Sequence, residues 1–249
     1  MAVTIIKKKS AEKVEKRTSA EVKAEFLKRI TRVAAHKNVY EIFNDFIYFT
    51  ATSMRNAYDR QDQAKWQERE ENYLRRAKSY SKEEMTEFSR LYALLVEGIE
   101  EGDCDFLGEV YMELSIGNKN MGQFFTPFSV SQLMAKLMGN TYTHRPETIN
   151  DPTCGAGGLL IGHIKQCKNS NVNYQLCKLY TGTDLDLIGV QMTYIQLSLL
   201  GAMAEITHGN SLTLKTYDVY ITPMCHIHKA EYAFIKAMQL IAKREVKNG

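Results

Sequence analysis

From residue 121 onward, short apolar runs alternate with longer apolar stretches along the chain. Four short runs end near residues 151, 184, 207 and 222 and have the length and composition of β-strands, while the longer stretches beside them fit helices. Strands separated by helices of about a dozen residues form βαβ units and a parallel sheet. The alternation therefore predicts an α/β fold with a parallel sheet of four strands.

The preceding part of the chain has a different pattern, which predicts helices. Apolar side chains recur at helical spacing over residues 39–50. The sequence SKEE, Ser81–Glu84, has the form of a capping box, and an apolar stripe follows it over residues 85–99. The stretch 59–80 is charged and has only a thin apolar side, so we expect its apolar residues to serve packing.

The first half of the chain consists of a basic segment followed by an acidic one. Residues 1–37 carry an excess of Lys and Arg and residues 38–120 an excess of Asp and Glu, although the net charge is only +3. A basic arm can contact DNA phosphates, but more often it is a solvated, partly disordered tail. We expect a basic arm over residues 1–37, a helical region over 38–120 and a ligand-binding domain over 121–249.

Composition limits the class of protein. The start of the sequence lacks the apolar core of a secretory signal, and no later run is long enough to cross a membrane. The five cysteines are an odd number without a CxxC pair, which fits reduced thiols. These features predict a cytoplasmic protein with no membrane partner.

The sequence DPTCGAGG, residues 151–158, places glycines directly after the first predicted strand. In open α/β sheets, ligands bind beyond the carboxyl ends of the strands, where glycine allows a close approach to the backbone. Asp184 ends the second strand and can accept hydrogen bonds from a ribose diol, and Asn210 follows the third strand and can contact a base edge. Together these three positions predict an adenosine site.

Four motifs resemble, in order, those of the N6-adenine DNA methyltransferases: MGQFFTP (121–127), DPTCGAGGLL (151–160), GTDLD (182–186) and HGNSL (208–212). The likeness is greatest to the modification subunits of type I restriction-modification systems, in which a segment similar to DFLGEVYMELSI (105–116) also precedes GQFFTP. The resemblance implies a Rossmann-like class I methyltransferase sheet and identifies the adenosine ligand as S-adenosylmethionine.

The resemblance also assigns roles to single residues. Thr126, in the loop that closes over the methionine part, would bind the cofactor carboxylate, Asp184 would bind the ribose, and Asn210 with Ser211 would contact the adenine. The other implied cofactor-binding residues are Phe125, Pro127, Asp151, Thr153, Gly155 and Gly157. Cys154 is expected to be a buried filler, and Asp186 either a supporting acceptor or a helix N-terminal charge.

The resemblance breaks at the loop that methylates adenine. The family has Asn or Asp, Pro, Pro and an aromatic residue after the fourth strand, which hold the exocyclic amine and stack on the flipped base. Here Thr222, Pro223, Met224 and Cys225 occupy these positions, so Thr222 and Pro223 are only a degenerate catalytic loop. We read the histidines of CHIHK, residues 225–229, as incidental and expect no metal site.

Three hypotheses follow. The first is a methyltransferase-family module that binds S-adenosylmethionine or a partner subunit, does not methylate alone, and acts with or against a restriction-modification system. The second is an active DNA adenine-N6 methyltransferase, completed by another chain. The third is an interaction protein with a vestigial cofactor site. Only four strands fit the sequence, so we also expect the apolar edge near the fourth strand to be covered by the N-terminal helices, a second copy or a methyltransferase or restriction-system subunit.

Overall fold

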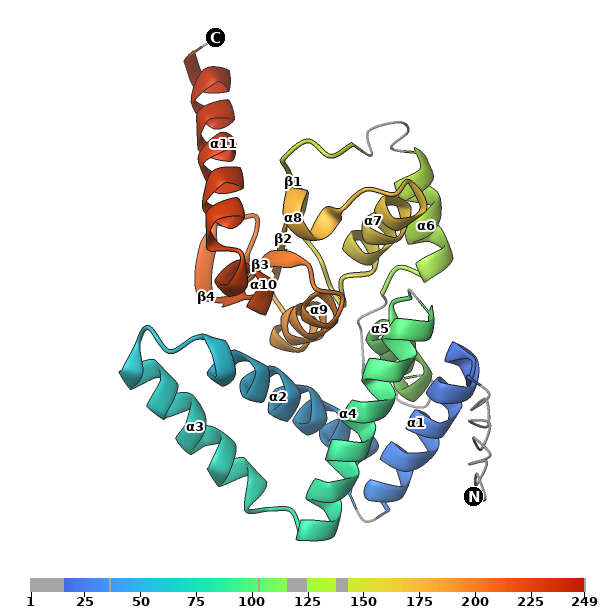
Figure 1. Ribbon diagram of the computed structural model, residues 1–249. Coiled ribbons are helices and arrows are strands. Elements are labelled where there is room, and N and C mark those ends of the chain that lie inside the picture. Colours follow the sequence, from blue (N-terminus) through green and yellow to red (C-terminus); the bar gives the residue numbers. More distant parts are fainter. Residues whose placement is uncertain (1–15, 36, 103, 116–124, 138–142, 249) are drawn as a thin grey trace, which may run out of the picture.

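The computed structural model describes residues 16–35, 37–102, 104–115, 125–137 and 143–248 (Figure 1). The first half of the chain is helical. Its helices are α1 (Ser19–Val33), α2 (Val39–Tyr58), α3 (Gln63–Ala77), α4 (Lys82–Gly102) and α5 (Phe106–Ser115). The capping box before α4 is confirmed, because the backbone N–H of Glu84 donates to the Ser81 hydroxyl and that of Ser81 donates to the Glu84 carboxylate.

Helix α1 corrects the interpretation of residues 1–37 as a solvated tail. Val22, Phe26 and Ile30 recur at helical spacing and are completely buried. Thr18 caps the helix in a capping box with Glu21, and α1 packs against α4. Lys23 and Arg29 of α1 are half-buried and pair with Glu109 on α5 and Glu87 on α4, so the basic residues belong to an ordinary amphipathic helix. Residues 1–15 lie outside the described part of the chain.

The second half contains the predicted α/β unit. Its elements are α6 (Phe128–Leu137), β1 (Glu147–Asp151), α7 (Gly158–Asn169), α8 (Tyr174–Cys177), β2 (Lys178–Asp184), α9 (Leu187–Leu199), β3 (Met203–Asn210), β4 (Lys215–Ile221), α10 (Pro223–Ile227) and α11 (Lys229–Asn248). The strands form one sheet in the order β1-β2-β3-β4.

Helices cover both faces of this sheet. Tyr180 and Ile206 face the main core with α7 and α9, whereas Leu179 and Met203 face a smaller core with α10 and α11. Nearly every residue of α9 is buried, because this helix lies between the sheet and α2 (Figure 1). Helix α9 therefore joins the N-terminal helices to the sheet.

The prediction of four parallel strands is wrong for the last one. Strands β1, β2 and β3 are parallel, but β4 runs antiparallel to β3. Only residues 211–214 connect β3 to β4, which suffices for a hairpin, whereas a parallel crossover needs about a dozen residues or more. The end of β4 consequently lies at the start of β3, at the opposite end of the sheet from the ends of β1 to β3.

The N-terminal helices cover part of the β4 edge. Arg55 on α2 donates hydrogen bonds to both carboxylate oxygens of Asp218, at 2.6 and 3.0 Å, and to the carbonyl oxygen of Val219 at 3.1 Å. Tyr217, earlier on β4, is 49% exposed. The expected cover by the N-terminal helices is thus present at one end of the strand, and the other end is open.

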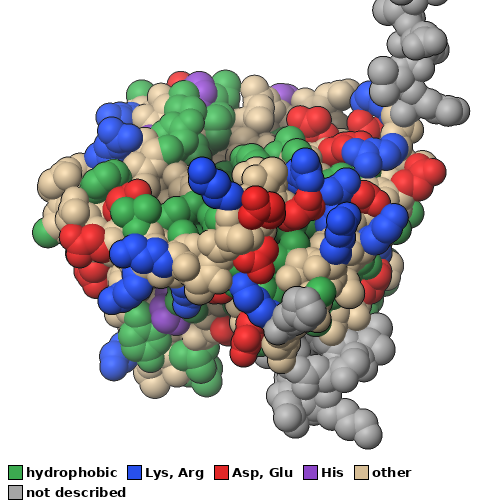
Figure 2. Space-filling model, turned by 90° about the horizontal axis from the view of Figure 1, so that it is seen from below, with side chains coloured by type: hydrophobic (Ala, Val, Ile, Leu, Met, Phe, Trp, Pro, Cys, Tyr) green, Lys and Arg blue, Asp and Glu red, His purple; other side chains and the backbone are tan. Residues whose placement is uncertain are grey.

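The face of the molecule seen from below shows basic and acidic side chains interspersed rather than a single-sign patch (Figure 2). Several basic residues of the N-terminal helices are paired with carboxylates, as Arg29 is with Glu87 and Lys37 with Glu84. A surface that binds nucleic-acid phosphates typically gathers unpaired Lys and Arg. Within the described residues, no helix combines the length and apolar character needed to cross a lipid bilayer.

Candidate functional site

The glycine turn between β1 and α7 has the backbone that only glycine adopts easily. Gly155 and Gly157 have φ angles of +50° and +92°. A Cβ atom on Gly155 would lie 2.8 Å from the ring of Phe125, and one on Gly157 would lie 3.1 Å from Thr193. The close neighbour of Gly155 within the chain is therefore the Phe125 ring, which brings the 125–127 segment onto the turn.

Asp184 connects the ends of β1 and β2. Its carboxylate accepts the backbone N–H of Gly155 at 2.8 Å and that of Asp186 at 2.9 Å. Asp151, at the end of β1, is buried and accepts the N–H of Thr153 at 3.0 Å. Burial, together with the charge of Asp184, raises the pKa of Asp151. Two carboxylates thus lie at the carboxyl ends of adjacent parallel strands.

Two side chains of helix α9 donate hydrogen bonds to the same turn. The Thr193 hydroxyl donates to the carbonyl oxygen of Gly155 at 2.7 Å, and the Gln196 amide donates to that of Ala156 at 2.8 Å. Both side chains are buried, so these bonds are shielded from water. The turn is consequently fixed from two sides, by Asp184 at the sheet and by α9.

A small cavity of about 80 Å³ lies beside the turn. Residues of two motifs that are predicted to bind the cofactor, MGQFFTP and DPTCGAGGLL, line this cavity. Its lining residues are Asp105, Phe125, Thr126, Asp151, Thr153, Cys154, Gly155, Ala156, Gly158 and Leu159. The Phe125 ring also packs against Tyr111, with 4.8 Å between ring centroids, and Pro127 directly precedes α6. The start of the MGQFFTP motif, residues 121–124, lies outside the described residues.

Asn210, the last residue of β3, and Ser211, which follows it, lie at the same end of the sheet. The Asn210 side-chain oxygen accepts the backbone N–H groups of Leu212 and Thr213, each at 3.0 Å. In this structure that oxygen caps the β3–β4 turn, and the amide N–H₂ remains the part of Asn210 able to face a base. Ser211 is half-buried on the same turn.

The degenerate catalytic loop does not join these residues. Thr222 is completely buried at the start of β3, where its hydroxyl donates to the Ala202 carbonyl oxygen at 2.7 Å and accepts the Ala204 N–H at 2.8 Å. From Ala204 to Asn210, β3 spans about 20 Å at the usual rise per residue. Thr222 therefore fastens β4 to β3 far from the glycine turn.

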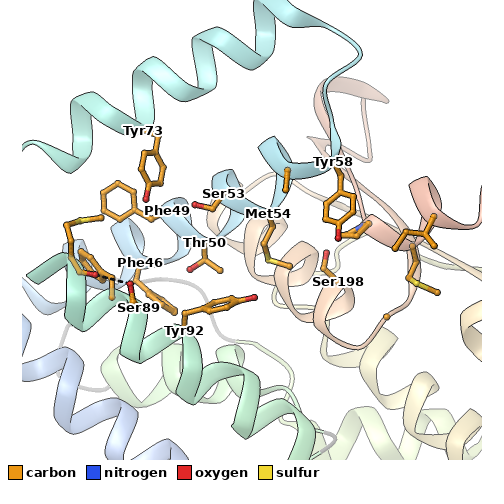
Figure 3. Close-up of a pocket in the computed structure, with 17 residues that line it drawn as sticks. Phe46, Phe49, Thr50, Ser53, Met54, Tyr58, Tyr73, Ser89, Tyr92 and Ser198 are labelled. Carbon is orange, nitrogen blue, oxygen red and sulfur yellow. Dashed lines mark hydrogen bonds between the residues drawn. The ribbon is translucent and has the colours of Figure 1, made fainter.

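Pro223 faces a different space. A cavity of about 630 Å³ lies among α2, α3, α4, α9 and α10, and Pro223 and Met224 form part of its wall (Figure 3). Its other walls are mainly aromatic and aliphatic, and Ser53, Tyr92 and Ser198 are among the hydroxyl-bearing residues that line it. Apart from Pro223, none of the predicted site residues lines this cavity.

Two residues near the turn were not singled out by the sequence pattern. Asp105 lines the small cavity, and burial raises its pKa to about 6, with Glu109 contributing. Gln196 donates to Asp105 at 2.8 Å as well as to Ala156. Asp105 precedes the apolar run of α5 and accepts the N–H of Gly108, a helix-capping signal readable from sequence, whereas nothing in the sequence marks Gln196.

The remaining predictions concern single side chains. Cys154 is buried with its thiol against Gly182, and burial raises its pKa, as expected of a filler. Asp186 caps α9, because its side chain accepts the N–H of Ile188. Cys225 is buried. In the described part of the chain, no group of three or more His, Cys, Asp or Glu side chains is arranged to hold a metal ion.

Comparison with known proteins relates the chain to a family and to a solved structure. The model of the N-6 DNA methylase family matches residues 103–237, more than half of the chain. The crystal structure of the type I restriction-modification system methyltransferase subunit from Streptococcus thermophilus is similar over 75% of this chain and 57% of that subunit, with 15% sequence identity and a TM-score of 0.41. The chain thus spans less than two thirds of that subunit.

Proposed function

The chain belongs to the N-6 DNA methylase family, and we propose that it binds S-adenosylmethionine at the carboxyl ends of β1 to β3 without transferring the methyl group by itself. Support comes from the glycine turn, Asp151 and Asp184, which meet at one end of the sheet beside a cavity that Thr126 also lines. When bound, this cofactor supplies an activated methyl group on a sulfonium sulfur.

The side chains at the strand ends suit the cofactor chemically. Asp184 accepts one backbone N–H with each carboxylate oxygen, which leaves acceptor capacity for the hydroxyls of a ribose. The cavity of about 80 Å³ is smaller than the usual pocket for a ligand of this size, so it can hold only one end of the molecule. The rest has to extend over the strand ends toward Asp184 and Asn210.

The position of Thr222 carries the proposal that the chain does not methylate alone. Methyl transfer requires the reacting atoms to approach within about 3–3.5 Å. The Thr222–Pro223 loop lies at the opposite end of β3 from Asp184 and Asn210. The Thr222 hydroxyl already donates one hydrogen bond and accepts another inside the sheet. The loop therefore has neither the place nor the free acceptor to hold an adenine amine.

The proposed setting is a cytoplasmic restriction-modification system, in which the chain acts with or against a methyltransferase or restriction-system subunit, with DNA as the shared substrate. All five cysteines are free thiols, which suits a reducing compartment. The open part of the β4 edge offers a place for a partner chain, since unpaired strand edges readily pair.

A methyl-transfer assay tests the catalytic part of the proposal. We expect calorimetry to detect S-adenosylmethionine binding by the purified chain, and scintillation counting to find no labelled methyl in unmethylated DNA. Incorporation of label into adenine by the chain alone would establish an active methyltransferase instead. Absence of binding would point to a vestigial cofactor site.

A further inference from the structure

A buried carboxylate and a buried hydroxyl converge on Gly158, the first residue of α7. Asp105 is 3% exposed, and its Oδ1 accepts the Gly108 N–H at 2.9 Å and the Gln196 amide at 2.8 Å. Its other oxygen, Oδ2, lies 3.0 Å from the point that a Cβ of Gly158 would occupy. A side chain at this position would be crowded by the carboxylate, so glycine lets the start of α7 pack closely against Asp105.

Ser131 on α6 reaches the same point. Its Oγ lies 3.3 Å from the Cβ position of Gly158, and the residue is completely buried. Within the described residues, this hydroxyl has no hydrogen-bond partner. Buried hydroxyls are nearly always hydrogen-bonded, so an unpaired one indicates a missing partner. Asp105 and Gly158 also line the small cavity beside the glycine turn.

The charge at this position is not balanced within the described residues. Lys23, which lines a neighbouring cleft together with Asp105, is already paired with Glu109 at 2.9 Å and Glu113 at 2.7 Å. An ionised carboxylate that is buried without a cation is costly to the fold. Such a group is typical of binding sites, where a ligand supplies the opposite charge.

We propose that Asp105 and Ser131 receive the ammonium group at the amino-acid end of the bound cofactor. This inference rests on the proposed function and goes further, because it assigns one end of the ligand to residues from α6 and from the helical region. A carboxylate can bind an ammonium group in a charge-assisted bond, and a hydroxyl can accept a second one. The adjoining N-terminus of α7 favours the carboxylate of the same zwitterion.

Two ligands separate this role from a structural one. S-adenosylmethionine carries the amino-acid end, whereas 5′-methylthioadenosine has the same nucleoside and lacks that end. For Asp105→Asn, which keeps an acceptor for Gly108, we expect calorimetry to show affinity for S-adenosylmethionine reduced about 10- to 100-fold, with affinity for 5′-methylthioadenosine unchanged. For Ser131→Ala we expect a smaller loss, again confined to S-adenosylmethionine, and Asp184→Asn should weaken both ligands.

Unchanged affinity of Asp105→Asn for S-adenosylmethionine would overturn the inference. An equal loss for both ligands would also overturn it, because Asp105 would then only shape the turn. Thermal unfolding of each variant shows whether the fold is retained, and Ser131→Ala provides a second variant if Asp105→Asn does not fold. If the parent chain binds neither ligand, the proposed function itself is contradicted. This outcome is distinct from one in which the parent binds and only the variants differ from expectation.

Discussion

At the scale of single residues, the proposed site uses an ionised Asp105, whereas burial of that carboxylate destabilises the fold. Its carboxyl is buried, and burial raises its pKa to about 6 from the ordinary 3.8. The folded chain therefore binds this proton more tightly than the unfolded chain does. The free energy of unfolding should gain from protonation of Asp105 as the pH falls through 6 toward 4, and this contribution should be complete below the unfolded pKa.

This pH dependence can be measured against Asp105→Asn, which has no charge to bury. At pH 7.5, we expect the free energy of unfolding, measured with urea, to be higher for the variant than for the parent by up to about 3 kcal/mol. The difference should shrink at pH 4.5. Asp218 acts in the opposite direction, because the hydrogen bonds from Arg55 outweigh burial and lower its pKa, but it is common to both proteins and cancels. A difference that stays constant with pH would contradict the burial of an ionised Asp105.

At the scale of secondary structure, most elements could be predicted from the sequence, because periodicity and capping are local signals. The direction of β4 was predicted wrongly from the same pattern. Strand propensity does not depend on direction, whereas the short connection over residues 211–214 permits a hairpin and not a parallel crossover. The consequence for function is large, since the direction of β4 decides at which end of the sheet Thr222 lies.

Thr222 is accordingly predicted to matter for stability. In Thr222→Val the Ala204 N–H loses its side-chain acceptor, and the Ala202 carbonyl oxygen loses its hydroxyl donor, inside the protein. We expect a loss of about 1–3 kcal/mol in the free energy of unfolding, measured with urea. Thr216→Val, at an exposed position on the same strand, should change it by less than about 0.5 kcal/mol. Equal stability of the two variants would show that the Thr222 contacts are not formed.

At the scale of the whole molecule, contacts between distant segments could not be predicted from one sequence. Gln196 reaches Ala156 across 40 positions, and Arg55 reaches Asp218 across 163. The residue types do not predict these buried contacts, because Gln and Arg are usually solvent-exposed. The candidate residues at the turn could be predicted from their motifs, whereas the side chains that hold the turn became visible only in the structure.

The open surfaces predict association. Besides the exposed part of β4, helix α11 presents Phe234, Met238 and Ile241 on one side, 55%, 46% and 51% exposed. Such an apolar stripe typically marks an interface. We expect light scattering to give a mass above the 28.5 kDa of one chain, and Phe234→Glu to lower it. A single-chain mass for the parent at high protein concentration would contradict self-association and leave a partner subunit as the occupant.

The most direct test of the central proposal is calorimetric titration with S-adenosylmethionine of the parent, Asp184→Asn and Asp186→Asn. Asp184 lies at the strand end beside the glycine turn, whereas Asp186 caps α9, a role that Asn fills equally well. We predict about 10- to 100-fold weaker binding for Asp184→Asn and less than about threefold for Asp186→Asn, at matched melting temperatures. Equal affinities for all three proteins would contradict a cofactor site at the strand ends.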